Sequence, residues 1–496
     1  MTERPGRINR LRRIFVRVSR SAWRRFIISS VVGLAVLGLM RIPQVDATMF
    51  GQPDREMMET AFKMRADLKG GMADPALLID IDDDAIAGSM PKPEQGQLPP
   101  APSATTPRTI IADVLEYIRT APPNQAAKVV IVDTDIATPT PGDEEGVVKL
   151  REVLSKWAAT PGVPVLLLAR QSFPEAVYGG GGDALILPTS PYDDIVEASQ
   201  GAISWGQVKV MADQNGVMRE ILPYECVVTA HGVQPLFNVA LTAYGFLQNG
   251  KIPDDAPVWK WIKGAADACK ANPPKRIIHG ELINYHLSLG KGENGRVWPE
   301  LPDNWPGFKV CGNGGDHYIF RRLAAADVAA AAAAGADADH AVLCSRLVLI
   351  GGTNIVASDF QQTPLNEMSG TVILANAATG LQLSNGGLRR VPWYLQISTL
   401  LLVSLMITGG FTVTRRIRDH YLGLKDRHKE SSFWVKVRLT PFNPVVLNWA
   451  FAFAAHWLGI SLLIFAMGHG YWGYLSAPAF AAAATGAMQE FADDDD

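Results

Sequence analysis

Short, continuous apolar runs alternate with amphipathic stretches through most of the segment between residues 42 and 390. Such runs predict strands buried on both faces, and the amphipathic stretches have the spacing of helices. The predicted strands are 76–81, 128–132, 163–168, 201–210, 217–229 and 346–350. The predicted helices are 108–119, 144–159, 235–247, 322–335 and 370–383. This alternation indicates an α/β domain, which the charge distribution below predicts to be extracytoplasmic, with a mostly parallel sheet and helices on both faces.

Longer apolar stretches predict about four transmembrane α-helices, at 26–41, 393–414, 445–467 and 471–488. The first contains a run of only 15 uncharged residues, and about 20 residues are needed to cross a bilayer. Trp23 and the neighbouring arginines lengthen it by snorkelling. We therefore favour an uncleaved signal anchor over a cleaved signal peptide. For 471–488, a helix lying on the membrane surface is the alternative.

The distribution of charge fixes an orientation for these segments. Residues 1–25 hold nine Arg and one Glu, and residues 415–438 hold eight Lys or Arg and three acidic residues. Basic segments remain on the cytoplasmic side of a membrane. The basic tail 1–25, the loop 415–440 and the acidic tail 489–496 are therefore predicted to be cytoplasmic, and 42–390 to lie outside. We expect the lipid bilayer, and no nucleic acid, as the partner of the basic segments.

All four cysteines, Cys226, Cys269, Cys311 and Cys344, belong to the predicted outer segment. An even number of cysteines in an oxidising compartment predicts two disulfides. Three pairings exist, and we favour Cys269 with Cys311, because this bond closes the Pro- and Gly-rich insertion at 252–315. Cys226 would then pair with Cys344, and free buried thiols are the alternative. A second insertion, rich in proline, covers 89–107.

Acidic residues follow the first two predicted strands, with Asp80 and Asp82 at the first and Asp133 at the second. Ligands usually bind at the carboxyl edge of an open α/β sheet. If the two strands are neighbours, Asp82 and Asp133 would share a site that holds a divalent cation through oxygen ligands. The alternative is that these side chains cap helices and close turns.

Signatures of common enzymes are missing from the sequence. There is no Gly-x-x-x-x-Gly-Lys-Ser/Thr loop, no Gly-x-Ser-x-Gly elbow and no His-Glu-x-x-His pair. We therefore predict no catalytic residue, no cofactor beyond the possible cation, and no enzymatic activity.

Several short motifs follow one another along the chain. They are Leu78-Ile79-Asp80-Ile81-Asp82-Asp83, Pro107-Arg108, Val130-Ile131-Val132-Asp133, the Asp-x-x-Gly-Val-x-Arg turn from Asp213 to Arg219, Pro235-Leu236-Phe237, Val348-Leu349-Ile350-Gly351 with Asp359 and Thr363-Pro364, and Gly370 to Asn376. Read in this order, they resemble one known family, the cyclase/histidine-kinase-associated sensory extracellular domain of the second type (CHASE-two). The resemblance covers roughly residues 45–385, and membrane helices follow it. In three places the chain departs from the family: Leu374 replaces the usual His, the Pro-Trp-Pro-Arg start is reduced to Pro107-Arg108, and the insertion at 252–315 is large.

The resemblance implies a sensory module in the periplasm of a bacterium, anchored as a multi-pass protein in the inner (plasma) membrane. Such modules feed a cytoplasmic output domain, and we recognise none in this sequence, so the resemblance implies a stand-alone sensor. Its expected partners are a small-molecule or protein ligand outside, a separate membrane or cytoplasmic signalling protein, and a second copy in a homodimer or larger complex.

The candidate ligand-binding residues combine acids at the predicted sheet edge with arginines that pair with carboxylates. They are Asp80, Asp82, Asp133, Arg108, Asp213, Arg219 and Asp359. Structural roles are the alternative for many of them, with the acids as caps and Arg219 as a buried ion-pair partner. Two other functions stay open: a scaffold or accessory subunit of an envelope complex, and an extracytoplasmic metal-dependent hydrolase that uses the aspartates.

Overall fold

The computed structural model divides the chain into two compact units. The α/β unit contains Arg65–Arg389 and Gly468–Gly470, and the terminal unit contains Met1–Met64, Arg390–Met467 and Tyr471–Asp496. Each unit is described below by itself. The described residues are 20–39, 76–82, 106–123, 126–138, 142–175, 184–213, 216–249, 256–271, 281–283, 320–334, 347–352, 360–390 and 392–402, with a few single residues and pairs elsewhere.

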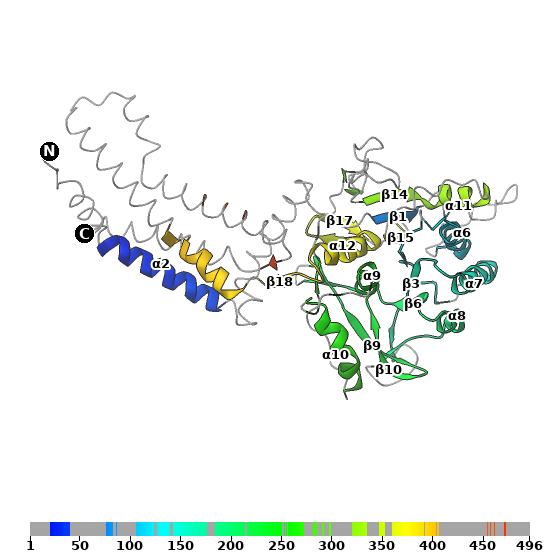
Figure 1. Ribbon diagram of the computed structural model, residues 1–496, viewed down its shortest axis with the longest axis horizontal. Coiled ribbons are helices and arrows are strands. Elements are labelled where there is room, and N and C mark those ends of the chain that lie inside the picture. Colours follow the sequence, from blue (N-terminus) through cyan, green and yellow to red (C-terminus); the bar gives the residue numbers. More distant parts are fainter. Residues whose placement is uncertain are drawn as a thin grey trace, which may run out of the picture. The chain divides into compact units, whose positions relative to one another are not determined.

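A six-stranded, entirely parallel sheet forms the centre of the α/β unit (Figure 1). Its strand order is β14-β1-β15-β2-β3-β6. The strands are β14 (Phe320–Ala324), β1 (Ala76–Ile81), β15 (Leu347–Gly352), β2 (Val129–Val132), β3 (Val165–Ala169) and β6 (Ile203–Gly206). The late strand β15 lies between β1 and β2, so the first two strands of the sheet are not neighbours.

Helices cover both faces of this sheet, as Figure 1 shows. Four pack against one another along one face, and two lie on the other, where α9 contacts β2 and β3 and α12 contacts β15 and β1. The first four are α6 (Arg108–Arg119), α7 (Glu144–Ala159), α8 (Asp193–Ala198) and α11 (Ala325–Ala334), and the other two are α9 (Val239–Leu247) and α12 (Gly370–Leu383). The prediction of a mostly parallel α/β domain is confirmed, and α6, α7 and α12 have the predicted bounds.

Alternation along the strands decides what each face of the sheet carries. In β1, Leu77, Ile79 and Ile81 join the main apolar core with residues of α6 and α7. Trp157 of α7 is fully buried in this core, and its Nε1 donates to the carbonyl oxygen of Pro164 at 2.9 Å. The other side chains of β1, including the fully buried Asp80, point to the face that α12 covers.

Two smaller sheets flank the central one, and here the sequence prediction was less accurate. The predicted helix 235–247 begins only at Val239, because Asn238 accepts a hydrogen bond from the backbone N–H of Ala240 as an N-cap. The residues before it, Gly232–Phe237, form a strand that pairs antiparallel with Tyr224–Thr229. The predicted strand 217–229 is two strands, and 201–210 covers β6 and the start of β7. These sheets are β10-β9-β5-β4 and β11-β8-β7, made of β4 (Phe173–Pro174), β5 (Leu185–Ile186), β7 (Val210–Ala212), β8 (Met218–Ile221), β9 (Tyr224–Thr229), β10 (Gly232–Phe237) and β11 (Glu281–Leu282).

One disulfide joins Cys226 of β9 to Cys269 of α10 (Trp259–Lys270), with Cα atoms 5.2 Å apart. The predicted pairings of Cys269 with Cys311 and of Cys226 with Cys344 are therefore wrong. The physical reason is that α10 packs on β9 and β10, where the Cys269 side chain lies beside Tyr224 and Phe237. Cys311 and Cys344 lie outside the described residues.

In the terminal unit, α2 (Arg20–Leu39) and the helical residues 393–402 make a close contact. A Cβ atom added to Gly33 would meet the end of the Leu400 side chain, so a larger residue at 33 would require this side chain to move. Within the described residues, no helix combines the length and the apolar character that a bilayer crossing requires. Most of the predicted spans 445–467 and 471–488 lies outside those residues.

The remaining strands are β12 (Gly290–Lys291), β13 (Val297–Trp298), β16 (Phe360–Thr363), β17 (Asn366–Ser369), β18 (Arg389–Arg390) and β19 (Tyr471–Trp472).

Candidate functional site

The carboxyl ends of β1, β15 and β2 bring several predicted residues to one edge of the sheet. Asp80 is the last residue but one of β1 and lies in register with Gly351 of β15, and Asp133 directly follows β2. Residues in register across parallel strands point to the same face, so Asp80 and Gly351 share the face that α12 covers. The first turn of α12 reaches this edge through Thr371. We call Asp80, Asp82, Asp133, Arg322 and Thr371 the edge cluster.

Arg322 of β14 is the cation of the edge cluster. Its Nε donates to Asp80 Oδ2 at 2.6 Å, and its Nη2 lies 2.5 Å from the same oxygen. The same Nη2 lies 3.8 Å from Asp82 Oδ2. Asp80 is completely buried, whereas the side chains of Arg322 and Asp82 are 28% and 25% exposed. The guanidinium therefore compensates a buried charge and also reaches a carboxylate that solvent can approach.

Asp133 is bound to the first turn of α12. Thr371 Oγ1 donates to Asp133 Oδ2 at 2.7 Å. Between the two strands, a Cβ atom added to Gly351 would lie 2.2 Å from Thr371 Oγ1 and 2.8 Å from its Cγ2. Glycine at 351 thus lets the helix approach the sheet closely enough for the hydroxyl of Thr371 to reach Asp133.

The predicted sharing of a site by Asp82 and Asp133 depended on β1 and β2 being neighbours. Because β15 lies between them, the two strands are about 10 Å apart, twice the spacing of adjacent strands. Each carboxylate instead has its own partner, Arg322 or Thr371. Among the described residues, no three His, Cys, Asp or Glu side chains come together as metal ligands would.

Arg108, the first residue of α6, holds the loop between β2 and α7. Its guanidinium donates to the carbonyl oxygens of Ile136 and Thr138, and its Nη1 lies 3.0 Å from Asp143 Oδ2. The side chain is only 2% exposed. Burial also raises the pKa of the nearby Tyr192 hydroxyl to about 12, although Arg108 opposes this shift. The structure thus gives Arg108 a role in positioning this loop.

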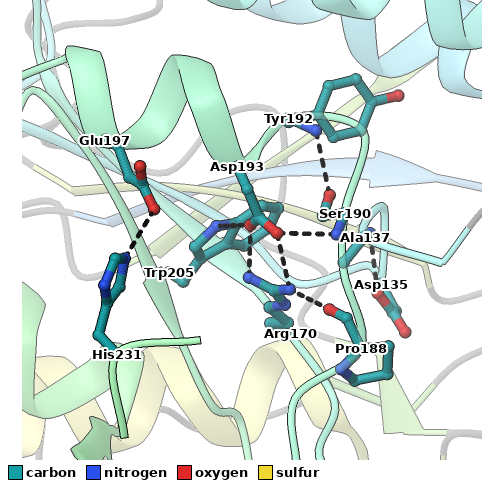
Figure 2. Close-up of polar contacts among 10 residues, drawn as sticks. All are labelled: Asp135, Ala137, Arg170, Pro188, Ser190, Tyr192, Asp193, Glu197, Trp205 and His231. Atoms are coloured by element: carbon teal, nitrogen blue, oxygen red, sulfur yellow. Dashed lines mark hydrogen bonds and ion pairs between the residues drawn. The ribbon is translucent and has the colours of Figure 1, made fainter. Parts of the chain in front are cut away.

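A second charged group occupies the same edge, at the ends of β3 and β6, and Figure 2 shows its contacts. Arg170 pairs with Asp193 of α8 through two contacts, at 2.6 and 3.1 Å. Asp193 also accepts from the backbone N–H of Ser190 at 2.8 Å and from Trp205 Nε1 at 2.9 Å. The Arg170 guanidinium stacks over the Trp205 ring at 4.8 Å. These contacts attach the start of α8 to the sheet.

Asp213 and Arg219 belong to a different sheet, in the β7–β8 hairpin. Arg219 Nε donates to Asp213 Oδ2 at 2.6 Å, and both side chains are 6% exposed. Asp213 Oδ1 also accepts from the backbone N–H of Val217 at 3.1 Å. Gly216 has a φ of +77°, a conformation that favours glycine. The Asp-x-x-Gly-Val-x-Arg motif is thus a turn closed by a buried ion pair.

The structure therefore brings Asp80, Asp82, Asp133 and Arg108 to one edge and places Asp213 and Arg219 elsewhere. Asp359 lies outside the described residues. Sequence reasoning missed Arg322, Thr371 and the Arg170–Asp193 pair. Arg322 is the first residue of the predicted helix 322–335, although the short apolar run from Tyr318 to Phe320 before it is also typical of a strand.

Asp82 and Arg322 are the residues of the edge cluster that are best placed to bind a charged ligand. They carry opposite charges, both are partly exposed, and they are only loosely paired at 3.8 Å. A ligand with a cationic group can bind Asp82, and one with an anionic group can bind Arg322. Either event would change how Arg322 is shared between the buried Asp80 and the accessible Asp82.

Comparison with known proteins identifies one family. The family model described as the CHASE2 domain matches residues 31–411. No curated protein and no solved structure matches the chain.

Proposed function

Because the chain belongs to the CHASE2 domain family of sensory domains, we propose that it is a membrane-anchored sensor whose α/β unit binds a small charged ligand at the edge cluster. The ligand-binding step takes place outside the plasma membrane, and a separate signalling protein receives the signal through the terminal unit. The observation that carries the proposal is the Arg322 guanidinium, which links a buried and an accessible carboxylate at the carboxyl edge of the sheet.

The placement of the edge cluster supports a sensory role. Open α/β sheets bind ligands beyond the carboxyl ends of their strands. Here that edge is connected directly to α12 by the hydrogen bond from Thr371 to Asp133. The chain leaves α12 after Leu383 and reaches the terminal unit at Arg390. A ligand that changes the position of the first turn of α12 therefore acts on the last helix before that unit.

The surface of the terminal unit supports membrane anchorage. Of the large apolar side chains that the structure shows to be exposed, all but Val148 and Val233 belong to this unit. Exposed apolar surface of this extent is typical of chains that meet lipid or other helices. Trp23, Trp393 and Tyr394 are among these side chains, and such aromatic residues favour the interface between lipid and water.

The experiment that tests the proposal is a thermal-shift screen of the detergent-solubilised full chain. The panel consists of divalent cations, amino acids, polyamines and small carboxylates, because the edge cluster offers one anionic and one cationic group. We expect stabilisation by one class, lost in Asp82→Asn and retained in Asp194→Asn, an exposed acid on α8. Stabilisation that survives Asp82→Asn and Arg322→Gln alike would contradict the proposed site.

A further inference from the structure

The helix α10 differs in charge from the other helices of the α/β unit. It carries Lys260, Lys263 and Lys270 against a single acid, Asp267. Among the described helices of this unit, α10 is the only one with a net positive charge. All four charged side chains are exposed, so they form a basic outer face on a helix whose inner side holds Ala265 and Cys269.

Two of these lysines lie against tryptophan rings of the same helix. Lys260 Nζ lies 4.4 Å from the centre of the Trp261 ring, and Lys263 Nζ lies 4.7 Å from that of Trp259. Lys260 Nζ also lies 3.6 Å from Oε2 of the buried Glu281, although the Lys260 side chain itself is 59% exposed. The face of a tryptophan ring attracts an ammonium group, so these contacts position both lysines on the outer surface of α10, where an anionic partner can reach them.

The helix is held rigidly at both ends. Near its C-terminus, the disulfide between Cys226 and Cys269 attaches it to β9. At its N-terminus, the backbone N–H of Val258 donates to the carbonyl oxygen of Gly386 at 3.0 Å. A rigid face loses little conformational entropy when it binds a surface, which favours association.

Gly386, which holds the N-terminus of α10, is close in sequence to an exposed aromatic pair. Gly386 is only seven residues before Trp393, the first of the exposed aromatic pair Trp393-Tyr394. Seven residues of extended chain cover at most about 25 Å. If Trp393 and Tyr394 lie at the membrane interface, as the proposed function requires, the N-terminus of α10 lies within that reach of the same interface.

We propose that α10 docks through Lys260, Lys263 and Lys270 onto the anionic headgroups of the lipid bilayer that anchors the chain. This inference rests on the proposed membrane anchorage and adds a second contact with the membrane. The attraction of each lysine for an anionic surface falls off within a Debye length. Docking therefore depends on lipid charge and on salt.

The test uses the full chain in vesicles of phosphatidylcholine, with or without one third phosphatidylglycerol. A membrane-impermeant amine acetylating reagent labels exposed lysines, and mass spectrometry reads each site. We expect several-fold lower labelling of Lys260, Lys263 and Lys270 in the anionic vesicles, reversed by high salt. Lys149 and Lys156 of α7, with 42% and 49% exposed side chains, are the internal controls and should label equally.

Charge reversal provides the matched comparison. Lys263→Glu with Lys270→Glu should restore labelling of Lys260 in anionic vesicles, whereas Lys149→Glu with Lys156→Glu should leave Lys260 protected. Equal labelling of α10 in both kinds of vesicle would overturn the proposal. Equal protection of the α10 lysines from acetylation in both kinds of vesicle would also overturn it, because protein and not anionic lipid would then shield them.

Extraction with alkaline carbonate tests the proposed anchorage independently. A chain that stays with the vesicles while α10 labels equally in both lipids refutes docking and leaves the anchored sensor intact. A chain that is extracted refutes the anchorage, and the labelling difference still decides whether α10 binds anionic lipid.

Discussion

Thr371 Oγ1 donates a hydrogen bond of 2.7 Å to Asp133 Oδ2 and thereby joins the first turn of α12 to the carboxyl end of β2. The two residues are 238 positions apart in the sequence. Thr371 is buried, with 1% of its surface exposed. We expect Thr371→Val, which keeps the shape and removes the hydroxyl, to lower the free energy of unfolding by about 1–3 kcal/mol. Chemical denaturation of the solubilised full chain measures this change.

Thr371→Ser is the control, because it keeps the hydroxyl, and it should recover most of the loss. Equal stability of the parent chain and both variants would show that the hydrogen bond contributes nothing.

Gly351 is the position at which this contact is most sensitive to added volume. A methyl group there would lie 2.2 Å from Thr371 Oγ1, so Gly351→Ala should destabilise the fold by about 1–3 kcal/mol. Thr371→Ala removes both atoms that the methyl group would meet most closely. The double variant should therefore be more stable than the sum of the two single effects predicts. Strict additivity in this double-mutant cycle would argue against the close approach.

Removing the cation from the edge cluster should cost far more than removing an exposed one. Arg322→Met leaves the fully buried Asp80 without this ion-pair partner, and we expect a loss of about 3 kcal/mol or more. Arg151→Met is the matched control, because Arg151 and Asp194 are 44% and 63% exposed and solvent screens the attraction in such a pair. Thermal unfolding of the two variants beside the parent chain gives the comparison. Similar losses in both would mean that Asp80 does not depend on Arg322.

Glu281 should make the stability of the α/β unit depend on pH. Burial raises the pKa of this carboxyl above its ordinary value of 4.5, against the opposing influence of Lys260 and of the hydrogen bond from Trp261. The folded protein then retains a proton that the unfolded chain releases. The free energy of unfolding should therefore fall as the pH rises from about 4.5 through the folded pKa.

The substitution Glu281→Gln removes this titration. The stability of the variant relative to the parent chain should rise with pH across that window and then level off. Melting temperatures of both proteins between acidic and neutral pH measure the difference. A constant difference between Glu281→Gln and the parent would contradict the assigned direction of the shift.

The disulfide between Cys226 and Cys269 predicts that a non-reducing digest contains a cross-linked pair of the peptides that carry these two residues. The bond closes a loop over a sequence separation of 43, for which the chain-entropy model gives about 4 kcal/mol of stabilisation. Cys269→Ser should lose stability of that order, and reduction of the parent chain should have the same effect. Recovery of a Cys269–Cys311 peptide instead would support the original pairing.

Local patterns in the sequence predicted most of the elements that position the edge cluster. The bounds of α6, α7 and α12 follow from helical spacing between clear end signals, and Asp80, Asp82 and Asp133 follow from their position after apolar strands. The elements near 201–237 were harder, because short strands of a flanking sheet carry no long apolar run. There the backbone pairing of β9 with β10 overrides local preference.

Long-range pairings account for the remaining differences. Nothing local in 347–352 indicates that β15 inserts between β1 and β2, so neither the separation of Asp82 from Asp133 nor the contact of Thr371 with Asp133 was predictable. The disulfide has the same origin, because four cysteines allow three pairings and only the packing of α10 on β9 selects one.

The central claim is that the α/β unit senses a ligand outside the plasma membrane. Its most direct test is the labelling of Val148→Cys, an exposed position on α7 with 68% of its surface accessible, by a membrane-impermeant maleimide in sealed spheroplasts. Ser431→Cys, in the predicted cytoplasmic loop 415–440, is the matched control. The account predicts that Val148→Cys is labelled above the parent chain before lysis and that Ser431→Cys is labelled only after lysis. Labelling of Val148→Cys only after lysis would contradict it.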